Sequence, residues 1–528
     1  MRTPGSAQRT TAQEGSAGPP PRAATGLAAL SGVLAAGVTV GVGQLVAGLP
    51  LGGLSPSAAP LVVVGDAVVD RVPAPVKDFA VSAFGTADKP VLLATIAVLV
   101  ALLAAAAGVL ARHRLALGVA VVAVLGVVGV LAAATRPDAT ALWPLPSALG
   151  AAAGAYVLTL LTRRLAPGGR STGLRRRAVL LGSVAAAGLT AAGAGRVLSG
   201  ARSAEESRAR VVLPAPAEAA PPVPPGADPA QLVGAGLTPY VTGNRDFYRI
   251  DTALVVPDVR AEDWTLRLHG MVEREITLTF DDLLALPLVE RWITLTCVSN
   301  EVGGDYAGNA KWLGYPLAEL LARAGVRDGA DTLFATSTDG FTLSAPLAEA
   351  ADGRDALLAV GMNGEPLPRE HGFPVRMVIS GLYGFVSACK WVTDIEVTRL
   401  AERTAYWTER GWAERAPVKT ASRIDVPRSF ATLRAGRVPV AGVAWAQDRG
   451  ISAVEVRVDR GEWAPAKVLP SVSEDTWCQW VFEWDAEPGG HVLEVRATDA
   501  TGTPQTAEVV APIPNGASGY DSVTVTVE

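Results

Sequence analysis

The chain has 528 residues, of which 49% are hydrophobic and only 18% are charged, whereas soluble domains average about 25% charged residues. This composition excludes a disordered chain and a small disulfide-rich module. The charge is divided unevenly. Residues 1–200 carry 16 Lys and Arg against 6 Asp and Glu, a net charge of +10, and the remaining residues carry 30 against 45, a net charge of −15. The acidic second part argues against nucleic acid as a partner.

The first 200 residues contain five apolar runs, each long enough to cross a bilayer, which requires about 20 residues. After a tail at residues 1–26, the runs cover residues 27–49, 90–111, 115–134, 142–162 and 178–198 of a segment that ends at residue 200. Apart from Arg196 near the end of the fifth run, charged residues are confined to the tail and the gaps, which disfavours buried helices of a soluble core. We therefore predict an all-α transmembrane segment of about five helices, which acts as an anchor or as a docking surface for a membrane partner.

The distribution of arginine predicts the orientation of these helices, because basic residues concentrate in cytoplasmic segments. Arginines precede the first run and fill the second-to-third and fourth-to-fifth gaps, whereas the other two gaps also contain aspartates. The arginines are Arg2, Arg9, Arg22, Arg112, Arg114, Arg163, Arg164, Arg170, Arg175, Arg176 and Arg177, and the aspartates are Asp66, Asp70, Asp78, Asp88 and Asp138. This alternation predicts a cytoplasmic N-terminus and places everything after Leu198 outside the cytoplasm.

The fifth run has a second interpretation. The triplet Arg175-Arg176-Arg177 followed by Ala178–Leu181 resembles a twin-arginine export signal. The alternative is a set of basic residues that flanks an ordinary membrane anchor. The export interpretation matters because that pathway carries domains that have already folded inside the cell, usually around a cofactor.

Two further regions follow the membrane segment. Residues 201–236 are rich in Pro and Ala and are predicted to form an extended, semi-stiff linker. Residues 237–415 mix strand and helix patterns, which predicts an α+β domain. The predicted strands are Trp264–Val272, Trp292–Cys297, Asp331–Thr336 and Val375–Ser380, and the predicted helices are Thr279–Leu286 and Leu317–Ala324.

Residues 416–528 have a different pattern of short alternating strands separated by turns. The strands are Val438–Trp445, Ala453–Asp459, Trp477–Trp484 and His491–Thr498. Strands at this spacing are typical of a β-sandwich, here predicted to be immunoglobulin-like. We expect its core, rather than an interface, to contain Trp445, Trp463, Trp477, Trp480 and Trp484.

The sequence contains three cysteines, Cys297, Cys389 and Cys478. They form no CxxC pair, no CxxCH haem motif and no zinc-type spacing. Cys297 ends a strand and precedes a polar loop, so it is either an exposed thiolate or a buried small hydrophobic residue.

The residues around Cys297 resemble the sulfite oxidase family of molybdopterin enzymes. The matching runs are Thr294–Asn300, Gly308–Gly314, Met362–Pro368, His371–Arg376 and Gly381–Trp391, and the resemblance extends over residues 244–397. It implies a molybdopterin-binding oxidoreductase domain in a multi-pass, membrane-anchored bacterial form. It also agrees with the sandwich, because this family commonly adds an immunoglobulin-like dimerisation domain.

The resemblance also implies roles for individual residues. Cys297 would be the catalytic residue and the thiolate ligand of a molybdenum ion that also binds one molybdopterin. His371 and Arg376 would contact the phosphate tail of the pterin. The remaining implied cofactor contacts are Ser387 and Lys390, in the matching phosphate-binding turn, and Asn244, Phe247 and Tyr248, in the first pterin-contacting segment.

The resemblance implies a two-electron transfer of an oxygen atom to or from a small oxyanion or sulfur compound. Sulfite itself is disfavoured, because Glu301, Val302 and Phe341 stand where sulfite oxidases place an arginine and a tyrosine. The chain offers no haem or iron–sulfur motif, which predicts a separate electron carrier, either a cytochrome or a quinone-linked membrane protein. The alternatives are a reductase of sulfoxides such as methionine sulfoxide, and a non-catalytic membrane scaffold or adhesion protein.

Overall fold

The computed structural model describes residues 21–49, 51, 54–72, 88–136, 139–165, 174–200, 203–253 and 255–528. The chain divides into two compact units, Met1–Ser199 and Gly200–Glu528. Most of the predicted cytoplasmic tail lies outside the described residues, as do Arg2, Arg9, Asp78, Asp138 and Arg170. The side chains of Arg22, Asp70, Asp88 and Arg175–Arg177 lie outside the description as well.

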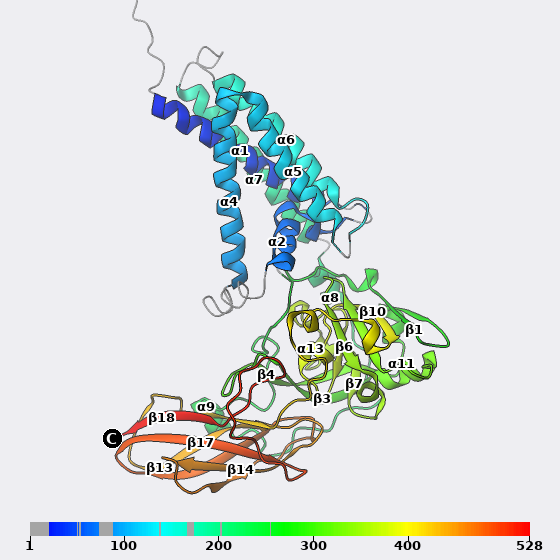
Figure 1. The fold of residues 1–528 in the computed structure, drawn as a ribbon, viewed down its shortest axis with the longest axis vertical. Coiled ribbons are helices and arrows are strands. Elements are labelled where there is room, and N and C mark those ends of the chain that lie inside the picture. The colour runs from blue at the N-terminus through cyan, green and yellow to red at the C-terminus, as the bar shows by residue number, and fades with distance from the viewer. Residues whose placement is uncertain are drawn as a thin grey trace, which may run out of the picture. The chain divides into compact units, whose positions relative to one another are not determined.

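The first unit is a bundle of helices (Figure 1). They are α1 (Pro21–Ala47), α2 (Pro60–Arg71), α4 (Asp88–His113), α5 (Leu115–Ala134), α6 (Pro144–Leu165) and α7 (Leu174–Gly200). Among the described residues, five segments are long and apolar enough to cross a membrane: Ala24–Ala47, Val91–His113, Leu115–Ala134, Pro144–Leu165 and Ala178–Val197. Each of the five predicted runs coincides with one of these segments to within a few residues, so the five apolar helices are confirmed.

Helix α1 packs against its neighbours through glycine. An added Cβ on Gly32 would collide with the backbone carbonyl of Ala104 in α4, and one on Gly195 in α7 would collide with the backbone of Gln44. A Cβ on Gly150 in α6 would similarly collide with α1. Such close backbone approach through small residues is typical of helix pairs in membranes, where packing replaces the hydrophobic effect as the driving force.

The second unit begins with short helices and two β-sheets (Figure 1). One sheet has the order β2-β1-β10-β5-β6, and the other has the order β3-β4-β7-β8, with β9 paired to β7. The strands are β1 (Thr265–Gly270), β2 (Ile276–Thr279), β3 (Val289–Thr296), β4 (Ala307–Pro316), β5 (Thr332–Ser337), β6 (Thr342–Pro346), β7 (Ala356–Met362), β8 (Glu365–Pro366), β9 (Arg376–Ile379) and β10 (Val392–Thr398). The helices are α8 (Ala204–Arg210), α9 (Ala230–Ala235), α10 (Phe280–Leu284), α11 (Leu317–Ala324), α12 (Leu347–Ala351) and α13 (Gly384–Ser387).

Local sequence explains the short helices well. The predicted helix Leu317–Ala324 is present with the same bounds as α11. It buries Leu317, Leu320, Leu321 and Ala324, which recur at the spacing of one helical face. It ends at Gly325, whose φ of 70° is the left-handed conformation that glycine adopts at little cost. Helix α10 begins at a capping box formed by Thr279 and Asp282.

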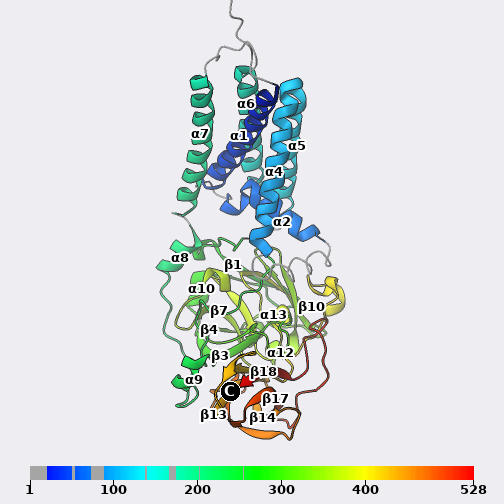
Figure 2. The ribbon, with the colours of Figure 1, turned by 90° about the vertical axis from the view of Figure 1, so that its left-hand side faces the viewer.

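The C-terminal region is all β. Its strands are β11 (Ala421–Val426), β12 (Thr432–Leu433), β13 (Gly436–Trp445), β14 (Ile451–Val458), β15 (Ala464–Val468), β16 (Cys478–Ala486), β17 (Gly489–Asp499) and β18 (Asp521–Val527). They form one hydrogen-bonded path, and a shared core joins side chains of β11, β13 and β16 with those of β14, β17 and β18. All four strands predicted for this region are present. Figure 2 shows these strands gathered below β3.

The five C-terminal tryptophans do not share one environment. Trp480 and Trp484 belong to the C-terminal core, whereas Trp445 and Trp477 are buried in the core of the preceding sheets. Trp463 is only half-buried and lies between the guanidinium groups of Arg457 and Arg496, 4.5 and 4.4 Å from its ring centroid. The prediction of one tryptophan-rich sandwich core is therefore wrong for Trp445, Trp463 and Trp477.

The linker prediction for residues 201–236 is also wrong in one respect. The described part of this segment is not a free tether, because Ala204, Ser207 and Ala227 are buried. The Ala217 amide donates to Leu288 O at 2.7 Å, which attaches the segment to the chain just before β3. The proline-rich stretch is extended, as expected, but its apolar and backbone groups pack on the second unit.

Candidate active site

Cys297 directly follows β3 and opens a closed loop. The Cys297 amide donates to Tyr306 O at 2.9 Å, at the start of β4. Inside the loop, Asn300 donates its amide to Cys297 O at 3.1 Å and accepts the Tyr306 amide on its side chain at 2.8 Å. The antiparallel pairing of β3 with β4, which ends at Thr296 and Ala307, thus fixes the position of the thiol.

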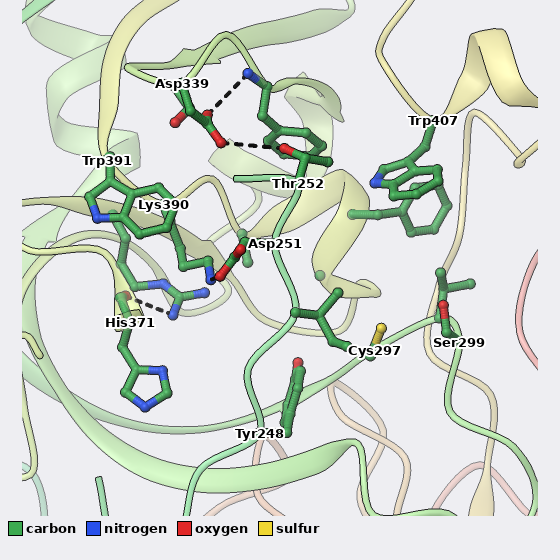
Figure 3. Close-up of a pocket in the computed structure, with 18 of the residues that line it drawn as sticks. Tyr248, Asp251, Thr252, Cys297, Ser299, Asp339, His371, Lys390, Trp391 and Trp407 are labelled. Carbon is green, nitrogen blue, oxygen red and sulfur yellow. Dashed lines mark hydrogen bonds and ion pairs between the residues drawn. The ribbon is translucent and has the colours of Figure 1, made fainter. Parts of the chain in front are cut away.

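The Cys297 side chain is 8% exposed and faces a cavity (Figure 3). Burial raises the pKa of the thiol, although the Ser299 amide and hydroxyl and the charge of Lys390 oppose that rise. The cavity is lined by Phe247, Tyr248, Ile250, Asp251, Thr252, Cys297, Val298, Ser299, Ser337, Asp339, Phe341, His371, Arg376, Gly384, Phe385, Ala388, Lys390, Trp391, Trp407 and Trp412. Because burial raises the pKa of the Cys297 thiol, this thiol is protonated at neutral pH in the cofactor-free chain.

Lys390 is a buried cation on one side of the cavity. Its Nζ lies 2.8 Å from Asp251 Oδ2, donates to Glu370 O at 3.1 Å and stands 4.9 Å from the centroid of the Trp391 ring. The same Asp251 oxygen pairs with Arg249 at 2.8 Å. Burial lowers the pKa of Lys390 to about 8, despite the attraction of Asp251.

Arg376 lies beside Lys390 and is 5% exposed. One guanidinium nitrogen donates to His371 O at 3.1 Å, and the group stacks 5.0 Å from the Trp312 ring centroid. Its buried Nε has no hydrogen-bond partner, and no acidic side chain among the described residues pairs with it. Burial lowers the pKa of Arg376 to about 10, so the group is a cation at neutral pH whose desolvation is not compensated.

His371 is neutral at physiological pH. Its ring is 3% exposed, and burial lowers its pKa to about 4. Nε2 lies 2.8 Å from the backbone oxygen of Asn244 and must therefore carry the ring proton, which leaves Nδ1 as a hydrogen-bond acceptor. If His371 contacts the phosphate, as expected, it does so as a neutral ring and not as a cation.

Backbone pairing brings the three residues together from separate segments. The Met377 amide donates to Cys389 O at 2.8 Å, which places Lys390 next to β9 and its first residue, Arg376. Gly372, with a φ of 111°, faces both side chains, since an added Cβ would lie 3.0 Å from Arg376 Cβ and 3.2 Å from Lys390 Cβ. A larger residue at this position would push the two cations apart.

Four further aromatic residues line the cavity. They are Phe341, Phe385, Trp407 and Trp412, and the Phe385–Trp412 and Trp407–Trp412 ring centroids lie 5.8 and 6.1 Å apart. We call these four residues the aromatic wall. In Figure 3, Trp407 lies above Cys297 and apart from His371 and Lys390. Among the described residues that line the cavity, Arg376 and Lys390 are the only Lys or Arg, and neither belongs to this wall.

The structure brings six of the eight predicted site residues to the cavity: Phe247, Tyr248, Cys297, His371, Arg376 and Lys390. Asn244 and Ser387 do not line it. The Asn244 side-chain amide donates to Met362 O and Glu365 and accepts from Asn363. The Ser387 hydroxyl donates to Leu382 O and Tyr383 O, inside the turn that contains α13. The side chains of both residues are thus bonded to other protein groups outside the cavity lining.

Sequence reasoning missed Asp251, Ser299 and most of the aromatic wall. Asp251 lies three residues after Tyr248, but no spacing rule marks it as the partner of Lys390. Trp407 and Trp412 follow the last matched segment and reach the cavity only because the chain turns back after β10. Of the positions that disfavoured sulfite, Phe341 lines the cavity, whereas Glu301 and Val302 are not among its lining residues.

Comparisons with known proteins show which proteins the chain is similar to. Residues 253–407 match the family model described as the oxidoreductase molybdopterin binding domain. Over 149 residues, the chain is 33% identical to the uncharacterized oxidoreductase YuiH of Bacillus subtilis, covering 28% of this chain and 72% of that protein. It is 31% identical over 274 residues to human mitochondrial sulfite oxidase, covering 43% of this chain and 49% of that protein.

Among solved structures, the sulfane dehydrogenase SoxCD of Paracoccus pantotrophus aligns with a TM-score of 0.47 and 23% identity, over 55% of this chain and 84% of that chain. The present chain spans about half the length of the mammalian sulfite oxidases it matches. The chain belongs to the sulfite oxidase family of molybdopterin-dependent oxidoreductases. Members of this family are molybdenum-dependent oxidoreductases, which disfavours the scaffold alternative.

The residues present fit the cofactor that the family implies. A molybdopterin carries an anionic phosphate, and the cavity offers Arg376, a buried cation whose Nε lacks a partner. The thiol of Cys297, a chemical group that can bind a metal ion, lines the same cavity. A buried charge without a counter-ion is costly, so an anionic ligand would stabilise this arrangement.

The pKa of Lys390 predicts a pH dependence for anion binding. Because this pKa is lowered to about 8, the charge of Lys390 is present below pH 8 and lost above it. The charged groups that act on Lys390 are Asp251, which raises the pKa, and Arg376 and Arg249, which lower it. We expect sulfate, whose charge is constant in this range, to bind the cofactor-free chain several-fold more weakly at pH 9 than at pH 7.

Tryptophan fluorescence during sulfate titrations would measure this change. The variant Lys390→Arg keeps its charge at pH 9, so its affinity should stay nearly constant between the two pH values. An equal pH dependence of the variant and the wild-type chain would contradict the assignment to Lys390.

Proposed function

We propose that the chain is a membrane-anchored enzyme that moves one oxygen atom to or from a small oxyanion or sulfur compound. The observation that carries the proposal is the Cys297 thiol in the same cavity as two buried cations, Arg376 and Lys390. When bound, the molybdenum–molybdopterin group would supply two-electron redox chemistry coupled to oxygen transfer. For a sulfoxide, the balanced reaction combines R–S(=O)–R′ with two electrons and two protons to give R–S–R′ and water.

In this proposal, the protein residues bind and orient. Cys297 supplies a thiolate to the metal, which enforces its deprotonation. Arg376 and Lys390 would hold the phosphate of the pterin, and Phe247 and Tyr248, which line the same cavity, would also contact the cofactor. His371 contributes a neutral acceptor, Nδ1, and its orientation depends on the hydrogen bond from Nε2 to the Asn244 carbonyl. Ser387 supports the turn between β9 and Lys390 rather than the phosphate itself.

Electrons must reach or leave this site through a separate carrier. The three cysteines of the sequence cannot complete a four-cysteine iron–sulfur site, and the sequence has no CxxCH motif. We therefore propose a cytochrome or a quinone-linked membrane protein as the partner. The C-terminal strands, whose two halves share one core, are proposed to be an immunoglobulin-like domain that supports a homodimer.

The membrane placement is part of the proposal. Five apolar helices support an anchor, and the arginine distribution supports a cytoplasmic N-terminus with the catalytic unit outside the bacterial cell membrane. A reporter fused after Glu528 should then be active only outside the cytoplasm. Replacement of Arg175–Arg177 by lysine should block export if these residues form a twin-arginine signal, and normal export would identify α7 as an ordinary anchor.

The aromatic wall favours a second candidate, a sulfoxide reductase. A doubly charged oxyanion would need convergent cationic donors, whereas the wall consists of Phe341, Phe385, Trp407 and Trp412. The two cations that line the cavity, Arg376 and Lys390, are not part of this wall, and the phosphate is proposed to bind to them. A neutral sulfoxide with an apolar substituent, such as that of methionine sulfoxide, suits these rings better than sulfite.

A homologous series of alkyl methyl sulfoxides tests this candidate. If the wall receives the alkyl group, each added methylene should raise kcat/KM about fourfold, since burying one methylene contributes about 0.8 kcal/mol. Steady-state rates with a reduced artificial electron carrier would measure the trend. Trp407→Ala should flatten the series, whereas Trp463→Ala, a change outside the cavity, should leave it intact. A series that is flat in the wild-type chain would exclude this substrate class.

The proposed function as a whole is tested with the full chain purified in detergent from a molybdenum-replete host. Metal analysis should find close to one molybdenum per chain, and turnover should appear with at least one of sulfite, a sulfoxide or nitrate. A molybdenum content far below one per chain would overturn the assignment of the metal site.

A further inference from the structure

The strand that ends at Cys297 is held along its free edge by the C-terminal region. Strand β3 is the edge strand of its sheet, so the backbone groups on its outer side need other partners. Gln447, which is fully buried between β13 and β14, donates Nε2 to Thr294 O at 2.9 Å and to Thr296 Oγ1 at 3.1 Å. Thr296 is the residue immediately before Cys297.

A second segment of the C-terminal region binds the same stretch of β3. The Thr294 amide donates to Asp475 O at 2.9 Å, and the Thr294 hydroxyl accepts the Trp477 amide at 2.8 Å. Trp477 is fully buried in the core of the catalytic sheets rather than in the C-terminal core. The backbone and the side chain of Thr294 therefore both form hydrogen bonds with residues more than 140 positions further along the chain.

The loop that follows Cys297 is held by the same region. Arg423 of β11 donates to Gly304 O at 2.6 Å, and its guanidinium is itself fixed by Asp425 at 2.7 Å. An added Cβ on Gly303 would collide with the carboxylate of Asp521, in β18. The C-terminal region thus contacts the chain on both sides of Cys297. The contacts before it are at Thr294 and Thr296, and those after it are at Gly303 and Gly304.

We propose that the C-terminal β region is a positioning element for the Cys297 thiol and that Gln447 is its central positioning residue. The proposal rests on the proposed role of Cys297 as a metal ligand. A ligand thiol must be held in one place for efficient chemistry, because displacements of about 1 Å can cost roughly 100-fold in rate. Gln447 fixes the end of β3 to the C-terminal region through Thr294 and Thr296. Loss of the Gln447 amide should therefore free Thr296, the residue before Cys297, while β3 remains paired with β4.

The test compares Gln447→Met with a matched control, Gln479→Met, in the full chain. Gln479 is also fully buried and also comes from the C-terminal strands, but its Nε2 donates to Thr238 O rather than to β3. The first measurement uses cofactor-free protein. Mass spectrometry would follow alkylation of Cys297 by iodoacetamide, separately from Cys389 and Cys478. We expect Gln447→Met to accelerate this reaction about tenfold and Gln479→Met to leave it unchanged.

The second measurement uses the cofactor-loaded enzyme. Gln447→Met should lower kcat at least tenfold with little change in KM, and it should alter the electron paramagnetic resonance spectrum of the singly reduced metal. If Gln447 had a purely structural role, both glutamine variants would have a lower midpoint of thermal unfolding, but kcat and the electron paramagnetic resonance spectrum would not change. If Gln447→Met does not fold, Thr296→Val, which removes one of the two hydrogen bonds and keeps the side-chain shape, should give a smaller change in the same direction.

Equal alkylation rates in the two glutamine variants would overturn the positioning role. This outcome is distinct from a failure of the proposed function. If Cys297→Ser retained metal and turnover, the ligand assignment would fail, whereas the alkylation of Cys297 in cofactor-free protein would still report whether Gln447 holds the thiol.

Discussion

Cys297→Ser is expected to abolish turnover and to leave the fold intact. The thiol is the soft ligand of the proposed metal site, and a serine hydroxyl is a harder donor that does not ionise near neutral pH. The change is nearly isosteric, and the side chain is already bordered by the polar Ser299, so the cost in stability should be small. Steady-state rates should fall by at least about 1000-fold, as is common when a reacting group is lost.

Cys478→Ala is the matched control for this variant. Cys478 is also buried, but it belongs to the core of the C-terminal strands and not to the cavity. Its replacement should lower stability somewhat, since it leaves a small cavity, and should leave turnover per molybdenum unchanged. Substantial activity in Cys297→Ser would show that the metal ligand lies elsewhere.

Arg376→Met is expected to have two effects of opposite sign. It should reduce the molybdopterin content of the purified chain at least tenfold, because the cation proposed to bind the phosphate is lost. In cofactor-free protein, it should raise the free energy of unfolding by about 1–3 kcal/mol, because an apolar side chain replaces a buried charge that has no counter-ion. The lowered pKa of Arg376, about 10, reflects the same desolvation. Pterin fluorescence after acid release and chemical denaturation would measure the two quantities.

Arg291→Met provides the contrast. Arg291 pairs with Glu218 and Asp355, both at 2.9 Å, and lies outside the cavity. Its loss leaves two carboxylates without their partner, so stability should fall, while cofactor content should not change. A loss of stability in cofactor-free Arg376→Met would mean that the charge of Arg376 is compensated by groups of the protein itself.

Much of the fold can be predicted from local pattern. The five apolar runs need only length and composition, since a bilayer-spanning helix satisfies its own backbone. Helix α11 needs only the spacing of Leu317, Leu320, Leu321 and Ala324 and a terminal glycine. Each of these signals lies within about 20 consecutive residues, so it can be recognised without knowledge of the rest of the chain.

The sequence predicted some residues of the cavity correctly and others not, for a physical reason. Cys297, Arg376 and Lys390 carry chemistry that few other roles require together, and their motifs mark them in the sequence. Ser387 lies in the same motif as Lys390, and Asn244 lies in the segment that also contains Phe247 and Tyr248, yet the side chains of Asn244 and Ser387 bond to other protein groups and do not line the cavity. Which atoms of a motif residue face a ligand depends on side-chain rotamers, and tertiary packing selects these.

The sequence by itself determined the family, the cofactor class and the presence of five apolar helices, because motif chemistry and hydropathy are local properties of the chain. Only the tertiary structure decided that Arg376 is buried without a counter-ion, that Asp251 pairs with Lys390 and that four further aromatic side chains line the cavity. It also decided that Gln447, 150 residues after Cys297, lies against the strand that holds the thiol. These relations join segments that are distant in the chain, and no local pattern encodes the packing that brings them into contact.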